Sequence, residues 1–230
     1  RLDEAFEYWQ KDIEIARELG LRLNECVVTR NLGAIHHVKG ELDDALPLYW
    51  LSYDIAKELD DKKNMGSALR NMNLIYIRQG DKEKAEQLLE EAIKIARECG
   101  DIVAESQTLL SLGALQDEHG SHEKAAEIYK KCIKTAKAAG NLSTEAVAYA
   151  NLGSIFEKIG NLKEALPMAD EALKLFLKLN DKSATICAYS NLAMVQLPLG
   201  MMDETYENLM KGLELSDQIK DTLYRTNVLS

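Results

Sequence analysis

Residues 151–165 read NLGSIFEKIGNLKEA, and related stretches recur along the chain at intervals of 40 residues. The interval is clearest at the glycines, because eleven of the 13 fall on one lattice of this period. Internal repetition of this length is typical of proteins that stack one supersecondary unit many times. One register of the lattice consists of Gly40, Gly80, Gly120, Gly160 and Gly200.

Each 40-residue unit is predicted to form two helices. In the second half of a unit, apolar residues recur three and four positions apart, as at Ala125, Ile128 and Tyr129, which indicates one buried helix face. A glycine followed by Asp, Asn or Ser separates the segments. Such a pair, for example Gly160-Asn161, favours a left-handed helix end followed by an N-cap. The pattern predicts antiparallel helices joined by tight turns.

The whole chain is expected to form one array over residues 1–230, because no Ser/Gly-rich or low-complexity segment interrupts the lattice. The repeat positions also give expected boundaries for the helix pairs. These are the second helix of a truncated repeat over 1–20, pairs over about 21–60, 61–100, 101–140, 141–180 and 181–220, and the start of a further helix over 221–230.

Composition and charge restrict the classes of function. The chain carries 38 acidic and 28 basic residues, a net charge of −10, which argues against a nucleic-acid partner. No apolar run approaches the ~20 residues of a membrane span, so we expect no membrane insertion. The cysteines form no CxxC pair, which favours a reducing compartment and a cytoplasmic location. They are Cys26, Cys99, Cys132 and Cys187.

Catalytic and cofactor motifs are absent from the sequence. It contains no phosphate-binding GxxxxGK[ST], no GxGxxG, no GxSxG and no HExxH. The one cluster that looks like a metal site is His119, His122 and Glu123, but it flanks a repeat-end glycine and is interpreted as a solvated turn. We therefore expect no enzyme activity, no cofactor and no metal.

The small residues of the repeat carry a resemblance to a known family. Leu112-Gly113 followed by Ala125, Tyr129 and Cys132 resembles the tetratricopeptide repeat (TPR). The usual TPR has 34 residues, and the longer period here resembles that of the Pins/LGN-type adaptors. The resemblance implies an all-α fold, a right-handed α-α superhelix (TPR solenoid) of antiparallel helix pairs.

The resemblance also assigns the residue before each Leu-Gly to the concave, ligand-binding groove. Because an Asn amide both donates and accepts hydrogen bonds, a column of such residues suits the backbone of an extended peptide. The alternative is that these amides tie neighbouring repeats together, and we prefer the peptide interpretation. The predicted groove residues are Asn31, Asn71, Ser111, Asn151 and Asn191.

Charged residues are expected to polarise this groove. Arg30, Arg70 and Arg78 fall near its N-terminal half and suit carboxylates or phosphates, whereas local ion pairs are an equal alternative. His37 is expected to point into the groove as a polar lining residue. Toward the other end, the lining is expected to be mainly acidic, with Asp117, Glu118, Glu157 and one base, Lys158.

The sequence therefore predicts a non-catalytic scaffold or adaptor for protein–protein interaction. Its partner would be an extended or disordered, acidic peptide segment of another protein, bound in the concave groove. The alternative is a ligand-sensing regulatory domain of a larger regulator or enzyme, responding to a signalling peptide or small molecule. Self-association through the array ends is left open.

Overall fold

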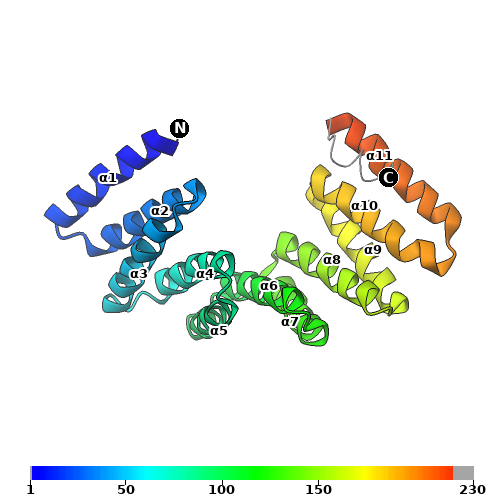
Figure 1. Ribbon diagram of the computed structural model, residues 1–230, viewed down its shortest axis with the longest axis horizontal. Coiled ribbons are helices and arrows are strands. Elements are labelled where there is room, and N and C mark those ends of the chain that lie inside the picture. Colours follow the sequence, from blue (N-terminus) through cyan, green and yellow to red (C-terminus); the bar gives the residue numbers. More distant parts are fainter. Residues whose placement is uncertain (1, 220–230) are drawn as a thin grey trace. The chain divides into compact units, whose positions relative to one another are not determined.

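A computed structural model describes residues 2–219, with side chains from residue 4 onward, and over this range it contains only helices. The predicted all-α solenoid class is confirmed (Figure 1). The segment 221–230, predicted to begin a further helix, lies outside the described residues. The α-helices are α1 (Leu2–Glu18), α2 (Arg22–Lys39), α3 (Leu42–Glu58), α4 (Lys62–Gln79), α5 (Lys82–Glu98), α6 (Ile102–Glu118), α7 (His122–Ala139), α8 (Leu142–Lys158), α9 (Leu162–Leu179), α10 (Lys182–Gln196) and α11 (Met202–Ile219).

Helix starts are set by short polar side chains, although not at every turn. The carboxylate of Asp61 accepts a hydrogen bond from Asn64 N at 3.0 Å, and the amide oxygen of Asn141 accepts one from Thr144 N at 3.2 Å. Both satisfy a backbone N–H that has no partner within its helix. The predicted cap at Asn161 is wrong in this respect, because its side chain makes no capping hydrogen bond.

Helix ends use the left-handed backbone conformation. Gly80, for example, has φ 79° at the end of α4, and its amide bonds back to the last turn. Two lattice positions carry other residues in the same conformation, Asp60 and Asn180, both with φ 53°. Asn and Asp tolerate this region better than most residues because their short polar side chains bond locally. The turn geometry is therefore kept where the glycine is missing.

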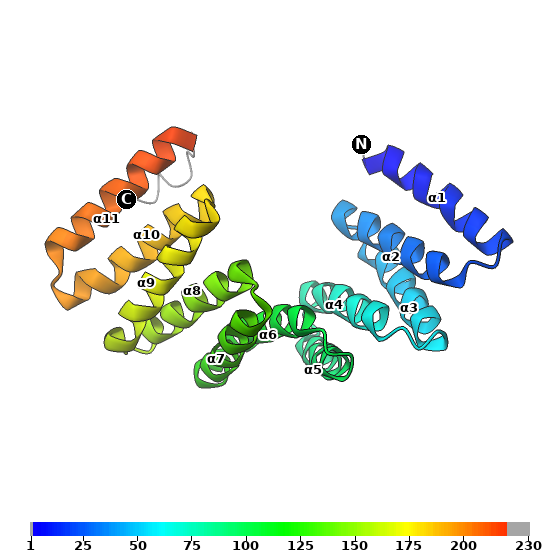
Figure 2. The ribbon, with the colours of Figure 1, turned by 180° about the vertical axis from the view of Figure 1, so that it is seen from behind.

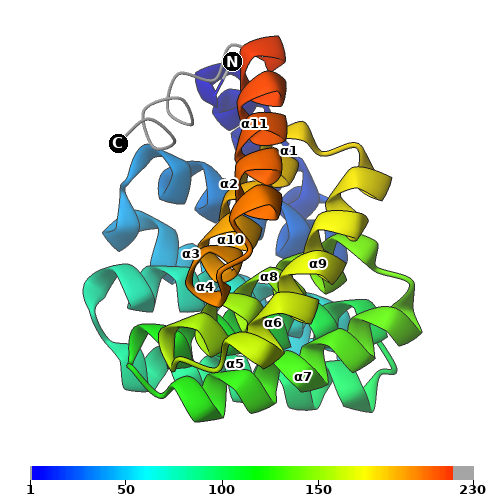
Figure 3. The ribbon, with the colours of Figure 1, turned by 90° about the vertical axis from the view of Figure 1, so that its right-hand side faces the viewer.

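The chain divides into two compact units, with the boundary after Thr108 inside α6. In the first unit, α2 packs against α1, α3 and α4, and α4 packs against α5 (Figure 1). In the second, α8 packs against α7, α9 and α10 (Figure 2), and α11 lies along α10 (Figure 3). A single array over 1–230 stays a prediction.

Glycines inside the helices let large rings cross between the two helices of a pair. A Cβ built on Gly113 would lie 2.6 Å from Cε1 of Tyr129, and one on Gly33 would lie 2.9 Å from Cε1 of Tyr49. Both tyrosines are 1% exposed. The Leu-Gly step therefore combines close helix approach with burial of an aromatic ring, which is a major source of core stability.

Candidate peptide-binding surface

In the first unit, the predicted groove residues lie on the two neighbouring helices α2 and α4 (Figure 1). All of them are half-buried except Arg78, which is exposed. We call the three arginines, Arg30, Arg70 and Arg78, the basic face. None of them forms an ion pair with a residue that the structure describes. The described contacts thus contain no local ion pair of the kind that the alternative interpretation requires.

Arg30 is held in place by a chain of amide and carboxylate groups. Its Nη1 donates to Oδ1 of Asn64 at 2.6 Å, and Nδ2 of Asn64 donates to Asp61 at 2.7 Å. Asp61 also caps α4, so the start of this helix positions the guanidinium. The other N–H donors of Arg30 stay available, because a guanidinium carries donors on all three nitrogens.

Arg70 is the more enclosed of the two half-buried arginines. Its Nη2 donates to the hydroxyl of Ser67 at a long 3.3 Å. Burial is the main cause that lowers the pKa of Arg70. The nearby charge of Arg30 lowers the pKa further, whereas the negative charge of Asp101 raises it. A guanidinium nevertheless stays protonated in proteins. Arg70 is therefore a cation that is partly removed from water, and one long hydrogen bond replaces little of its lost hydration. Such a group favours the binding of an anion.

His37 lies between an aromatic ring and a positive charge. Its ring meets that of Tyr49 edge-on, with centroids 6.4 Å apart. Burial, and then the charge of Arg78, lower the pKa of His37. The imidazole is therefore neutral near pH 7 and offers a donor and an acceptor rather than a charge.

The five residues of the predicted column differ in their contacts. The side chains of Asn31 and Asn71 make no hydrogen bond to any residue that the structure describes, and the same holds for the exposed Asn191. Nδ2 of Asn151, in contrast, donates to the hydroxyl of Tyr129 at 3.1 Å and ties α8 to α7. At Asn151 the geometry therefore matches the alternative interpretation, in which the amide ties neighbouring repeats together. Ser111 is half-buried and has a partner.

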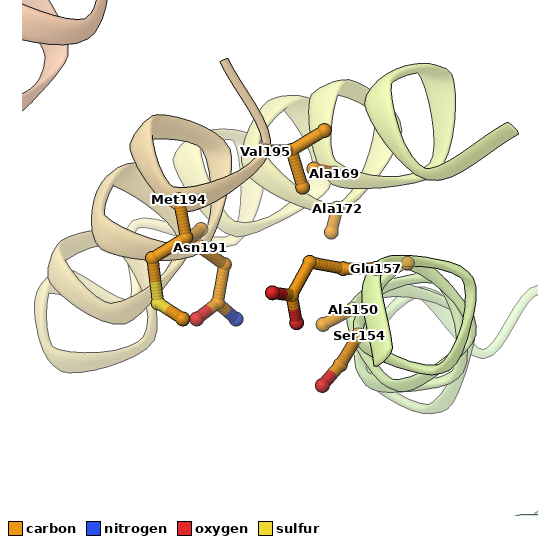
Figure 4. A pocket seen from close by; sticks show the side chains of 10 residues that line it. Ala150, Ser154, Glu157, Ala169, Ala172, Asn191, Met194 and Val195 are labelled. Carbon is orange, nitrogen blue, oxygen red and sulfur yellow. The ribbon is translucent and has the colours of Figure 1, made fainter. Parts of the chain in front are cut away.

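Acidic residues of the second unit also divide into paired and unpaired ones. Asp117 accepts from Lys158 at 2.8 Å and lies 2.9 Å from Nδ1 of His122. Glu157 has no such partner among the described residues and faces, with Asn191, a pocket between α8, α9 and α10 (Figure 4). The exposed Glu118 also has no such partner among the described residues, so Glu118 and Glu157 are the two predicted acidic groove residues that stay open to a ligand.

Residues 58–226, well over half of the chain, match the family described as the MalT-like TPR region. The chain belongs to this family. The finer resemblance to Pins/LGN-type adaptors stays a prediction. A comparison with curated protein sequences gave no match.

Solved structures share the fold of this MalT-like TPR chain at low sequence identity. BtubC (BKLC) from P. vanneervenii has a TM-score of 0.85 at 19% identity, with 96% of this chain and 93% of that chain covered. The apo form of RapI has a TM-score of 0.80 at 18% sequence identity, with 89% of this chain and 74% of that chain covered. A Rap protein complexed with competence and sporulation factor has a TM-score of 0.69 at 17% sequence identity, with 90% of this chain and 57% of that chain covered. The chain spans little more than half of that last protein.

Among the described residues of this TPR chain, one group could hold a metal ion, His36, Glu41 and Asp44, with ligand atoms within 4.8 Å of one another. Nδ1 of His36 lies 2.7 Å from a carboxylate oxygen of Glu41, so a hydrogen bond accounts for the contact between these two residues. None of the described helices is long and apolar enough to cross a membrane.

Sequence reasoning missed two residues that shape these surfaces. Asn64 holds Arg30, and nothing in its sequence context distinguishes it from an ordinary polar residue of a first turn. Ala169 lines the α8–α10 pocket and stands where the other helix pairs carry a larger side chain. The small size of Ala169 could have been noticed in the sequence, because Tyr49 and Tyr129 occupy the same lattice position.

Proposed function

We propose that this TPR chain is a protein-interaction module that binds an extended, acidic segment of a partner protein. The observation that carries the proposal is the basic face of the first unit. Its three arginines lack ion-pair partners among the described residues, although the chain as a whole has a net charge of −10. In an acidic chain, unpaired basic groups on adjacent helices favour a ligand that supplies the missing carboxylates.

The asparagines of the first unit support an extended ligand. Asn31 follows Arg30 directly, and Asn71 follows Arg70, so each half-buried guanidinium has a free amide beside it in the chain. A guanidinium suits the carboxylate of a ligand side chain, and an amide suits the ligand backbone. Such alternation favours an extended segment over a folded partner surface.

Related structures support the general form of the proposal. A fold of this kind, in a Rap protein, is found complexed with competence and sporulation factor. Stacked helix pairs commonly present broad surfaces for protein and peptide ligands. A scaffold or adaptor role, a cytoplasmic location and the absence of a nucleic-acid partner remain predictions of the sequence.

Isothermal titration calorimetry tests the proposal with a peptide of alternating Glu and Ser, and with its Gln-for-Glu counterpart. The double variant Arg30→Ala/Arg70→Ala is expected to weaken binding of the Glu peptide at least tenfold, since a charge-assisted hydrogen bond contributes about 1.5–3 kcal/mol. Arg97→Ala is the matched control, because Arg97 is paired with Glu105 at 2.6 Å in the same unit. Equal binding of the two peptides would refute the proposal.

A further inference from the structure

Two guanidinium groups of the basic face meet at the first two turns of α4. Nη1 of Arg30, which belongs to α2, donates to Oδ1 of Asn64 at 2.6 Å. Nη2 of Arg70 donates to Oγ of Ser67 at 3.3 Å. Asn64 and Ser67 are three positions apart, and residues with this spacing are neighbours on a helix surface, with about 5–6 Å between their Cβ atoms. The two guanidinium groups therefore lie near each other although they come from different helices.

A third cation stands beside this pair. Lys63 is exposed and precedes Ser67 by four positions and Arg70 by seven, which places the three side chains on one face of α4. Lys63 and Arg70 also border the same small hollow. The ammonium group of Lys63 makes no ion pair with any residue that the structure describes. We call Arg30, Lys63 and Arg70 the α4 cation cluster.

Two carboxylates stand near the cluster, and each is engaged at the start of a helix. Asp61 accepts hydrogen bonds from the backbone N–H of Asn64 at 3.0 Å and from its Nδ2 at 2.7 Å. Asp101 accepts one from Ala104 N at 2.9 Å. In the described part of the chain, neither carboxylate forms an ion pair with a member of the cluster. The three positive charges of the cluster therefore outnumber these two negative charges.

The closeness of like charges also affects Arg70 itself. The charge of Arg30 adds to the effect of burial and lowers the pKa of Arg70. An anion that bridges the two guanidinium groups would relieve this repulsion. A guanidinium carries five N–H donors, and the hydrogen bonds to Asn64 and Ser67 use one from each arginine. Most of the donors of both groups are thus available to such an anion.

We propose that the α4 cation cluster binds the phosphate group of a phosphorylated serine in the partner segment. A phosphoserine carries a charge of about −1.5 to −2 and three acceptor oxygens, whereas a glutamate carries a single charge on two oxygens. Two planar guanidinium groups and an ammonium group can donate to all three phosphate oxygens. The inference rests on the proposed function in that an extended partner segment is bound, and it adds the chemical class of the residue that the arginines recognise.

Calorimetry with a modified form of the Glu peptide tests the inference. One central Glu of the alternating Glu and Ser sequence is replaced by phosphoserine, which we call the phosphoserine form. It is expected to bind the full chain at least tenfold more tightly than the Glu peptide, because it adds charge and a third acceptor oxygen at the cluster. Inorganic phosphate, added as a competitor, should displace the phosphoserine form only at a large excess, since it lacks the contacts of the peptide.

Variants of the cluster identify the residues that hold the phosphate. Lys63→Gln should weaken binding of the phosphoserine form several-fold. Lys82→Gln is the matched control, because Lys82 is an exposed lysine at the start of α5 without an ion pair among the described residues. Arg30→Lys/Arg70→Lys keeps both charges but removes the planar donors, so it should lose most of the preference for phosphoserine over Glu. Both lysines are exposed, so their comparison tests the proposal even if the arginine variant fails to fold.

The outcomes separate this inference from the proposed function. The inference is overturned if the phosphoserine form binds no more tightly than the Glu peptide, or if Lys63→Gln weakens its binding no more than Lys82→Gln does. It is also overturned if inorganic phosphate displaces the phosphoserine form at equal concentration, because the cluster would then bind a free anion. If the Glu peptide and its Gln counterpart bind equally while the phosphoserine form still binds more tightly, only the proposed function is overturned.

Discussion

At the scale of single residues, Gly113 and Gly153 stand at equivalent positions but should respond oppositely to a methyl group. In Gly113→Ala the new Cβ would lie 2.6 Å from Tyr129, and overpacking of this kind costs about 1–3 kcal/mol. In Gly153→Ala it would lie in ordinary contact at 3.4 Å, so the better helix propensity of alanine, up to about 1 kcal/mol, should dominate. Urea unfolding measures both, and equal effects would contradict the structural assignment.

A second prediction at the residue scale is that the stability of the fold depends on pH through His37. Burial and the charge of Arg78 hold the pKa of His37 below its ordinary 6.5, so the unfolded state binds more protons between the two values. The neutral ring's contribution to stability is therefore lost as the pH falls through about 6.5 toward the lowered pKa. An NMR titration of His37 should show a midpoint below 6.5, and Arg78→Ala should raise it. An unchanged midpoint in that variant would exclude the charge effect.

At the scale of the helix, α4 contains two glycines that serve different purposes. Gly80 ends the helix at φ 79°, where a Cβ is unfavourable, so Gly80→Ala should lose about 1–2 kcal/mol of stability. Gly66 lies inside the helix, and a Cβ there would meet only Ile95 and Arg70 at 3.7 and 3.8 Å. Gly66→Ala should therefore gain up to about 1 kcal/mol. Thermal unfolding should show shifts of opposite sign.

The helices themselves were largely readable from the sequence, for physical reasons. Apolar spacing marks a buried face, and a glycine followed by Asp or Asn marks a turn, so the all-α solenoid class was correctly predicted. Cap contacts were less readable. Asp81 and Asn161 both follow a repeat-end glycine at the same lattice position, yet only Asp81 bonds a backbone N–H. A cap hydrogen bond depends on the side-chain rotamer as well as on the residue type.

At the scale of the whole molecule, the candidate site was predictable in its residues but not in their contacts. The sequence placed Arg30, Arg70 and Asn71 on neighbouring helices, which the structure shows. That Asn151 bonds Tyr129 while Asn71 bonds no described residue depends on which ring lies opposite in three dimensions. The division into two units inside α6 had no sequence signal, because the lattice runs through it unchanged.

The net charge of the molecule provides a test of the proposal that the chain binds an acidic ligand. Lowering the ionic strength should change the affinity for the Glu peptide in opposite directions in the original chain and in the arginine variant. The chain carries a net charge of −10, which repels an acidic peptide at long range, whereas the basic face attracts it at short range. Lowering the ionic strength from about 0.15 M to about 0.01 M extends the screening length from about 8 Å to about 30 Å and strengthens both effects. We expect the close arginine contacts to dominate, so the Glu peptide should bind the original chain more tightly at low salt. Without the two half-buried arginines, the growing repulsion should outweigh the attraction of the remaining Arg78, and Arg30→Ala/Arg70→Ala should bind more weakly at low salt. Parallel salt dependence of the two proteins, measured by calorimetry, would show that the basic face does not receive the acidic ligand.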